Sequence, residues 1–151
     1  MNVTTLFFGE LQVEEKDVIT FTQGMPGFEE LTKYTMIKPD ESLPFIYFQS
    51  MEEGGLSFLM TNPFQFFGDY DFELSTSIQE ELKIQDQTDI SVWTVVTVND
   101  DFSKASVNLM APVVLNQKEN LAKQIILHDS EYQIKHELIL NTSDETNEAK
   151  G

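Results

Sequence analysis

Two carboxylates placed two residues apart are the first candidates for chemistry in this chain. Asp69 and Asp71 flank Tyr70 within residues 61–72. If that stretch is extended, alternate side chains point the same way, so the two carboxylates could act as a general acid and a general base. Two acids beside an aromatic ring also form an ordinary polar rim. We favour the rim, and keep as the alternative a small-molecule or carbohydrate-binding β-barrel, possibly hydrolytic, that uses Asp69 and Asp71.

Other residue types that carry catalysis or bind metals are sparse. His128 and His136 lie near acidic residues, but no HExxH-type spacing is present and carboxylates are frequent throughout the chain. The chain has no cysteine, hence no thiolate ligand or nucleophile. No phosphate-binding glycine loop, nucleophile elbow or dinucleotide fingerprint occurs. We therefore expect surface histidines, no catalytic residue, no metal, no cofactor and a protein that is not an enzyme.

Aromatic side chains crowd the stretch that holds the two aspartates. Residues 61–72 include Phe64, Phe66, Phe67, Tyr70 and Phe72. The Asn-Pro pair before them requires an extended or turn backbone, because the proline ring clashes with a helical preceding residue. Each aromatic side chain buries about 150–250 Å² when covered. The cluster therefore fills a core, forms a face that binds a partner, or is divided between the two.

Acidic residues dominate the charge. The chain has 26 acidic and 9 basic residues, for a net charge of −17, and every basic residue is a lysine. Without arginine it lacks the bidentate fork that suits phosphate and guanine. Nucleic acid is therefore not expected as a direct ligand. The acidity either keeps the protein soluble or attracts a basic partner.

Length and composition indicate one globular domain. The chain has 151 residues, of which 40% are hydrophobic. We expect a single domain over residues 1–140 and a disordered polar tail over residues 141–151. No apolar run approaches the roughly 20 residues of a membrane helix, and the first residues do not resemble a signal peptide. We expect a cytoplasmic protein.

Short β-rich runs separated by turn residues predict the fold. Leu6, Phe8, Leu11 and Val13 are inward candidates in the first strand region. Ser77 and Glu80 form a capping-box pattern that predicts one short helix over residues 77–82. This pattern indicates a mainly β protein, a small antiparallel β-barrel with one short helix. The expected strands span residues 4–13 (a pair or one bent strand), 18–22, 34–37, 45–50, 56–60, 90–98, 105–110, 112–116 and 122–127.

Three motifs taken together resemble those of a known family. Gly24-Met25-Pro26-Gly27-Phe28 resembles the G-[LIM]-P-G-F segment of the bacterial flagellar assembly factor FliW family. Asn62-Pro63-Phe64, followed by Phe67 and Asp69-Tyr70, resembles the family's N-P…F…D/E-Y segment. Asn108-Leu109-Met110-Ala111-Pro112 stands where the family has N-L-x-A-P. The resemblance covers roughly residues 3 to 140.

The resemblance implies protein–protein regulation without catalysis. FliW proteins bind flagellin in the cytoplasm and also bind the RNA-binding translational repressor CsrA. When flagellin is exported, freed FliW captures CsrA away from its RNA-contacting surface, which relieves the repression of flagellin translation. The resemblance also implies a small antiparallel β-barrel, in agreement with the strand pattern.

We expect the partner-binding surface on the aromatic segment. Aromatic side chains would supply a desolvated centre, and carboxylates would steer a basic repressor dimer toward it. We expect a monomer when no partner is bound; self-association through the aromatic face is a further alternative. The residues themselves leave open which aromatics are buried and whether flagellin and CsrA share one site. The expected contact residues are Asn62, Pro63, Phe64, Phe67, Asp69, Tyr70 and Asp71.

Overall fold

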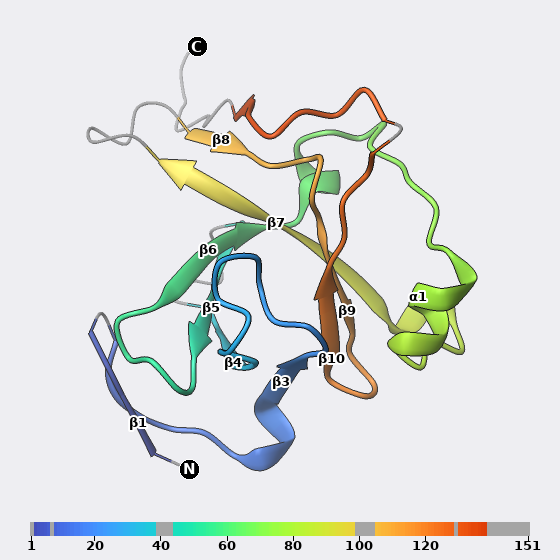
Figure 1. Ribbon diagram of the computed structural model, residues 1–151. Coiled ribbons are helices and arrows are strands. Elements are labelled where there is room, and N and C mark those ends of the chain that lie inside the picture. Colours follow the sequence, from blue (N-terminus) through green and yellow to red (C-terminus); the bar gives the residue numbers. More distant parts are fainter. Residues whose placement is uncertain (1, 7, 39–43, 99–104, 129, 139–151) are drawn as a thin grey trace.

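The computed structural model describes residues 2–6, 8–38, 44–98, 105–128 and 130–138 (Figure 1). The tail expected over residues 141–151 lies outside these residues. The strands are β1 (Asn2–Thr5), β2 (Gly9–Gln12), β3 (Val18–Phe21), β4 (Lys33–Ile37), β5 (Phe45–Ser50), β6 (Ser57–Thr61), β7 (Ile90–Val98), β8 (Ala105–Val107), β9 (Val113–Asn116), β10 (Leu121–Gln124) and β11 (His136–Leu138). The helices are α1 (Thr76–Glu81) and the 3-10 turns η1 (Glu15–Asp17), η2 (Pro63–Gln65) and η3 (Gln87–Asp89).

The main sheet closes on itself. Its strand order is β11-β8-β7-β6-β5-β4-β3-β10-β9, and β7 also pairs with β9. Strands β3, β4, β5, β6, β7, β9 and β10 therefore form a ring. All these pairings are antiparallel except that of β10 with β3, which is parallel. The fold is mainly β and barrel-like with one α-helix in the described residues, which confirms the predicted class.

Alternating side chains fill the barrel. On β5, Ile46 and Phe48 belong to the interior cluster, so Tyr47 and Gln49 point outward. The interior is apolar and aromatic, and it excludes water from the ladder hydrogen bonds. Its fully buried members include Phe21, Tyr34, Phe48, Met60, Val113 and Ala122.

Two further clusters lie outside this interior. The second cluster gathers residues of β7, β8, β11 and the aromatic segment, including Tyr70, Val96, Val107, Leu109 and Leu138. The third seats α1 on the barrel through Leu82, Val114 and Ile125. Glu81 ties the helix down as well: its carboxylate accepts hydrogen bonds from Thr22 Oγ1 at 2.5 Å and Lys123 Nζ at 2.9 Å. These contacts hold the pKa of the Glu81 carboxyl below its usual value.

The predicted helix exists, but its predicted cap is wrong. Ser75, not Ser77, precedes the first turn with extended backbone angles, and its Oγ accepts the Ile78 N–H at 3.3 Å. Ser77 lies inside the helix, where it cannot adopt the extended conformation of a capping residue. The extended chain that leads from the aromatic segment sets where the helix begins.

The N-terminal pair of strands forms a separate small sheet. β1 and β2 pair with each other in antiparallel register, from Asn2 opposite Gln12 to Thr5 opposite Gly9. The prediction of Leu6 as an inward residue is wrong, because this side chain at the hairpin tip is 72% exposed. Val13 is buried, as predicted.

The Gly-Met-Pro-Gly-Phe loop places one side chain in the barrel and another on its surface. Pro26 and Gly27 occupy the centre of a turn closed by the Phe28 N–H, which donates to the Met25 oxygen at 2.7 Å. Gly27 has φ +87°, as the third residue of a type II turn requires. Met25 is buried in the interior cluster, whereas Phe28 is 40% exposed against Phe58.

Gly24 is required both for its backbone conformation and for the space beside it. Its φ is +70°, and a Cβ there would lie 2.6 Å from the Glu29 carbonyl oxygen. A Cβ on Gly27 would meet no atom within 4 Å. Both glycines thus adopt a left-handed backbone conformation, but only at Gly24 does the missing Cβ also make room for a neighbouring backbone segment.

We expect Gly24→Ala to destabilise the fold more than Gly27→Ala. The left-handed backbone costs an alanine roughly 1–2 kcal/mol at either position. The backbone clash at Gly24 adds about 1–3 kcal/mol. Urea unfolding followed by circular dichroism measures both variants against the unsubstituted chain. Equal destabilisation would show that the approach of Glu29 is not a constraint.

Candidate partner-binding surface

The aromatic segment begins with a capped turn. The Phe64 N–H donates to Asn62 Oδ1 at 2.9 Å, and Pro63 occupies the first helical position of η2. The Phe67 N–H then donates to the Pro63 oxygen at 2.8 Å. The Asn-Pro pair therefore builds a rigid turn directly after β6, and this turn fixes where each following aromatic side chain points.

Tyr70 joins two of the sequence motifs. Its ring is 4% exposed, and its hydroxyl donates to the Leu109 carbonyl oxygen at 2.7 Å. Its ring also lies edge-on to Tyr132, with centroids 4.6 Å apart. Burial, and then the neighbouring Tyr132, raises the pKa of the Tyr70 phenol well above its usual value of 10. The segment is thus bound to the Asn-Leu-Met-Ala-Pro motif 39 residues further along the chain.

Two of the expected contact side chains do not lie at the surface. Tyr70 and Pro63 are buried, because each packs against the body of the protein rather than facing solvent. Asn62 is half-buried, and its side-chain oxygen is used by the cap. These three residues position the segment from beneath.

Phe64, Asp69 and Asp71 are the exposed members of the expected set. The Phe64 side chain is 44% exposed, and both aspartates are exposed. Below Phe64 lies Tyr70, with ring centroids 5.7 Å apart. The segment therefore presents one aromatic side chain with carboxylates near it along the chain.

A groove runs from Phe64 toward α1. We call it the α1 groove; its volume is about 630 Å³, and both apolar and polar side chains line it. Asp71 and Glu73 lie among its lining residues, which include no lysine. The complete lining is Phe64, Asp71, Phe72, Glu73, Leu74, Gln79, Ile84, Gln87, Ile90 and Val92.

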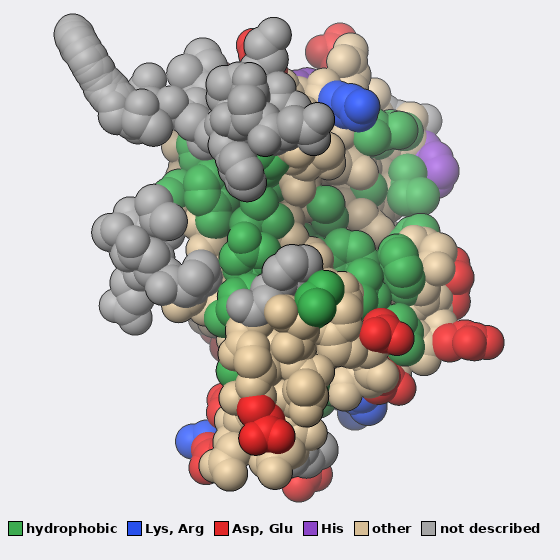
Figure 2. Space-filling model, turned by 90° about the vertical axis from the view of Figure 1, so that its left-hand side faces the viewer, with side chains coloured by type: hydrophobic (Ala, Val, Ile, Leu, Met, Phe, Trp, Pro, Cys, Tyr) green, Lys and Arg blue, Asp and Glu red, His purple; other side chains and the backbone are tan. Residues whose placement is uncertain are grey.

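Phe66 and Phe67 pack away from this groove. Phe66 stacks on Phe45 of β5, with centroids 6.3 Å apart, and Phe67 lies edge-on to His136 at 5.9 Å. Both are half-buried members of the second cluster. Figure 2, which views the left-hand side of the molecule in Figure 1, shows hydrophobic side chains gathered on that face. The short η2 turn thus directs aromatic side chains to two different surfaces.

A stretch near the C-terminal end supports the segment, and sequence reasoning did not find it. The Tyr132 hydroxyl accepts the Asp71 N–H at 3.0 Å, from 61 residues away. His136, expected at the surface, is half-buried, and its Nε2 accepts the Gln133 N–H at 2.7 Å. His128 is exposed, as expected. No local pattern marks Tyr132 as a partner of Asp71, because the contact is made only in the tertiary structure.

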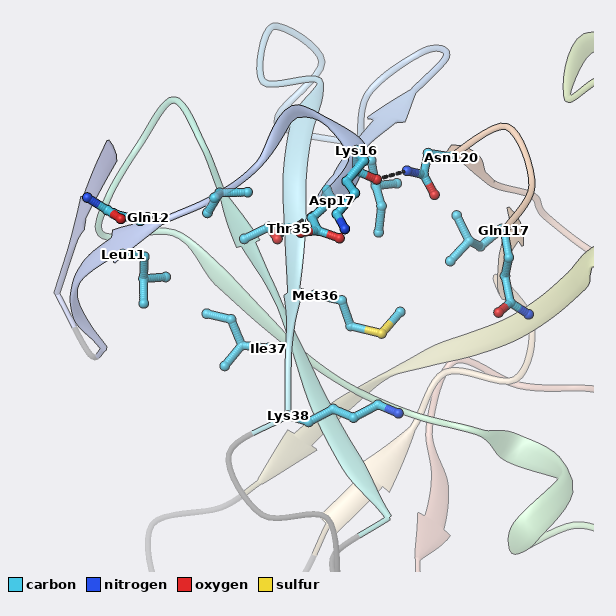
Figure 3. A pocket seen from close by; sticks show the side chains of 13 residues that line it. Leu11, Gln12, Lys16, Asp17, Thr35, Met36, Ile37, Lys38, Gln117 and Asn120 are labelled. Atoms are coloured by element: carbon cyan, nitrogen blue, oxygen red, sulfur yellow. Dashed lines mark hydrogen bonds between the residues drawn. The ribbon is translucent and has the colours of Figure 1, made fainter. Parts of the chain in front are cut away.

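The alternative of a barrel-mouth site at Asp69 and Asp71 finds no support in the geometry. A cleft of about 540 Å³ lies beside β4, and Figure 3 shows Lys16, Asp17 and Lys38 among the side chains that line it. Neither aspartate lines this cleft. Asp71 lines the α1 groove, but Asp69 does not. Among the cavities described for the residues in the structure, none is lined by both carboxylates.

The described residues offer neither a metal-binding cluster nor a helix able to cross a membrane. They contain no group of three or more histidine, aspartate or glutamate side chains arranged to hold a metal ion. Within the same residues, no helix has the length and apolar character needed to cross a membrane.

Comparison with known proteins identifies the relatives of this chain. The sequence model of the family described as "FliW protein" matches residues 2–138. The chain is 41% identical over 140 residues to the flagellar assembly factor FliW of Alkaliphilus metalliredigens, covering 92% of this chain and 86% of the relative. It is 38% identical to that of Bacillus subtilis strain 168, covering 90% and 95%.

A solved structure agrees with the sequence relatives. The fold matches a crystal structure of the flagellar assembly factor FliW with a TM-score of 0.87 and 33% identity. The match covers 93% of this chain and 99% of the other. The closed sheet with its appended aromatic segment thus has the fold of the flagellar assembly factor FliW. The chain belongs to the FliW family.

We expect Tyr70→Phe and Tyr34→Phe to have different effects on stability. Tyr70→Phe leaves the buried Leu109 oxygen without its donor and should cost about 1–3 kcal/mol. The Tyr34 hydroxyl is also buried but has no hydrogen-bond partner in the described structure, so its removal should be neutral or stabilising. Urea unfolding measures both, with Asp69→Asn as an exposed control. A larger loss for Tyr34→Phe would contradict the assignment of Tyr70 as the anchor.

Stability should also fall at alkaline pH. Burial, and then the Glu52 carboxylate, raises the pKa of Tyr34 to about 12, and the pKa of Tyr70 is raised too. The folded chain keeps these two phenol protons to higher pH than the unfolded chain does. Their contribution to the free energy of unfolding is therefore complete below about pH 10 and is lost above it. The loss is up to about 1.4 kcal/mol per pH unit for each phenol. Unfolding free energies measured across this range should fall less steeply in Tyr34→Phe. An unchanged slope would contradict the raised pKa.

Proposed function

We propose that this chain is a flagellar assembly factor that binds flagellin and antagonises the translational repressor CsrA, so that flagellin translation follows export. Membership of the FliW family supports the role, since the relatives carry that name. The structural observation that carries the proposal is an exposed Phe64 on a rigid turn, with exposed carboxylates at Asp69 and Asp71. The protein acts in the cytoplasm, by binding rather than by catalysis.

The charge of the chain supports a basic partner. An RNA-binding repressor must present a basic surface to phosphate. The net charge of −17 gives that partner a complementary field, which speeds encounter at low salt. The same charge repels RNA, so the complex disfavours a bound transcript. This inhibition does not require the protein to occupy the RNA-contacting surface, and it is allosteric.

The contact surface combines an aromatic anchor with an acidic border. Phe64 already projects from the surface, so little reorganisation is needed before a partner covers it. Phe67 contributes at the second, half-buried face. Asn62, Pro63 and Tyr70 act by holding the turn. A buried aromatic anchor surrounded by polar groups is the usual composition of an interface centre.

We expect Phe64→Ala to weaken repressor binding by roughly 30-fold, the loss of about 2 kcal/mol that is common for an aromatic anchor. Isothermal titration calorimetry with the purified repressor dimer, and separately with flagellin, measures the change. Phe28→Ala is the matched control, because Phe28 is similarly exposed on a different loop. Circular dichroism confirms that both variants are folded.

The carboxylates should act on the association rate. Asp69→Asn and Asp71→Asn should each slow association a few-fold and reduce its dependence on salt, while Glu15→Gln on η1 serves as the exposed acidic control. Stopped-flow or surface-based kinetics at several salt concentrations measures this. If Phe64→Ala and both aspartate variants bind normally while folded, the contact surface lies elsewhere. A salt-insensitive complex would contradict electrostatic steering.

A further inference from the structure

The N-terminal hairpin, residues 2–12, is set apart from the rest of the packed structure. Its strands β1 and β2 form a sheet of their own. None of the three hydrophobic clusters found in the described residues includes a residue of this hairpin. Val3 and Thr5 are buried nonetheless, at 7% and 6% exposure. They are therefore covered against a different surface.

That surface is the outer face of the β5–β6 pair. The Leu6 N–H donates to the Gly54 oxygen at 2.9 Å, and Gln49 Nε2 of β5 donates to the same oxygen at 3.2 Å. The Phe8 ring lies edge-on to Tyr47, with centroids 5.1 Å apart. Since Tyr47 and Gln49 point away from the barrel interior, the hairpin must lie on the outside. Figure 1 shows β1 beside the end of the barrel that carries the β5–β6 turn.

The covered face includes two polar side chains whose hydrogen bonds are only partly satisfied. Gln49 is fully buried, and while its Nε2 donates to the oxygens of Ser50 and Gly54, its Oε1 has no partner in the described structure. Ser57, which pairs with Gln49 in register on β6, has a buried Oγ that likewise lacks a partner there. Water would bond both atoms if the hairpin moved away, so undocking recovers hydrogen bonds that docking leaves unmade.

We propose that the N-terminal hairpin is a detachable strap, which undocks from the closed barrel as a unit and uncovers the outer face of β5 and β6. Unfolding the barrel is not required, because the hairpin contributes no side chain to the described clusters. Because a two-stranded hairpin has little stability alone, the hydrogen bonds between β1 and β2 also open when the hairpin undocks.

Undocking would enlarge an existing apolar surface. Tyr47 lies opposite Leu59 in the β5–β6 register, and both side chains are on the outer face. Leu59 belongs to the second cluster together with Phe66 and Phe67. The uncovered face is therefore continuous with the aromatic segment, and the strap controls how much of it a partner can reach. The existence of the strap does not depend on which partner binds.

Gly54 allows the hairpin to be released selectively. A Cβ on Gly54 would lie 2.1 Å from the Thr4 carbonyl oxygen, an impossible approach that only the docked hairpin creates. The φ of Gly54 is not in the left-handed region, so alanine fits its backbone. The adjacent Gly55 is a matched control, because its nearest atom is a flexible Glu53 oxygen at 3.6 Å.

The absence of cysteine from the sequence allows a direct test with single thiols. Ser57→Cys places a thiol on β6 opposite Gln49, where the Ser57 Oγ is buried, and Ala122→Cys places one in the fully buried barrel interior. Labelling with a thiol reagent under native conditions should be at least about 100-fold faster at Ser57→Cys than at Ala122→Cys, since local opening is more frequent than global unfolding. Adding Gly54→Ala should raise the labelling rate at Ser57→Cys about tenfold or more. The labelling rate at Ala122→Cys should stay within about threefold of its value without Gly54→Ala.

Two further variants keep the test decisive. Gly55→Ala should change neither labelling rate. Phe8→Ala, which removes the ring contact with Tyr47, should repeat the selective effect of Gly54→Ala with no new clash, and thus covers the case in which Gly54→Ala does not fold. Equal labelling rates at the two thiols, or a proportional rise at both thiols in Phe8→Ala, would mean that the hairpin opens only with the barrel, and would overturn the proposal.

Discussion

The rest of the structure depends on the pairing of one strand, β7, with three partners. Its first residues, Ile90–Trp93, pair with β9, its centre pairs with β6, and Val96–Val98 pair with β8. The first half closes the barrel and removes the free edges that β6 and β9 would otherwise present. The second half extends past the barrel and carries β8 and β11. A strand of nine residues rich in β-branched side chains has the length and stiffness for both tasks.

The extension of β7 creates the platform on which the aromatic segment lies. Leu109 follows β8, and Tyr132 precedes β11; both reach the segment through the Tyr70 ring and the Asp71 backbone. Phe64 is exposed because the residues around it, Pro63 and Tyr70, are held inward. The exposure of the surface that we propose binds a partner is thus a consequence of internal packing. Tyr132 and the buried Tyr70 therefore support this proposed surface from beneath.

In this protein, the side chains that give the surface its charge differ from those that form the packed clusters. The described residues form two ion pairs, Lys16 with Glu14 and Lys123 with Glu81, and only the second is largely buried. Within the described part of the chain, most acidic side chains are exposed and form no ion pair with lysine. Their field therefore extends into solvent, where it acts on encounter and solubility more than on stability. Stability comes from the three apolar clusters. The acidic surface is therefore free to serve recognition.

Local patterns alone determined the β class of this protein, the limits of strands such as residues 45–50 and 90–98, the Pro-Gly turn and the acidic surface, because propensity, alternation and turn chemistry are read within a few residues. Only the tertiary structure decided the rest: the parallel β3–β10 pairing, strand β11, the Ser75 cap, the space required at Gly24 and the inward position of Tyr70. Residues 61–72 follow neither a strand nor a helix period. Their burial is set by contacts 39 and 61 residues away, which no local pattern contains.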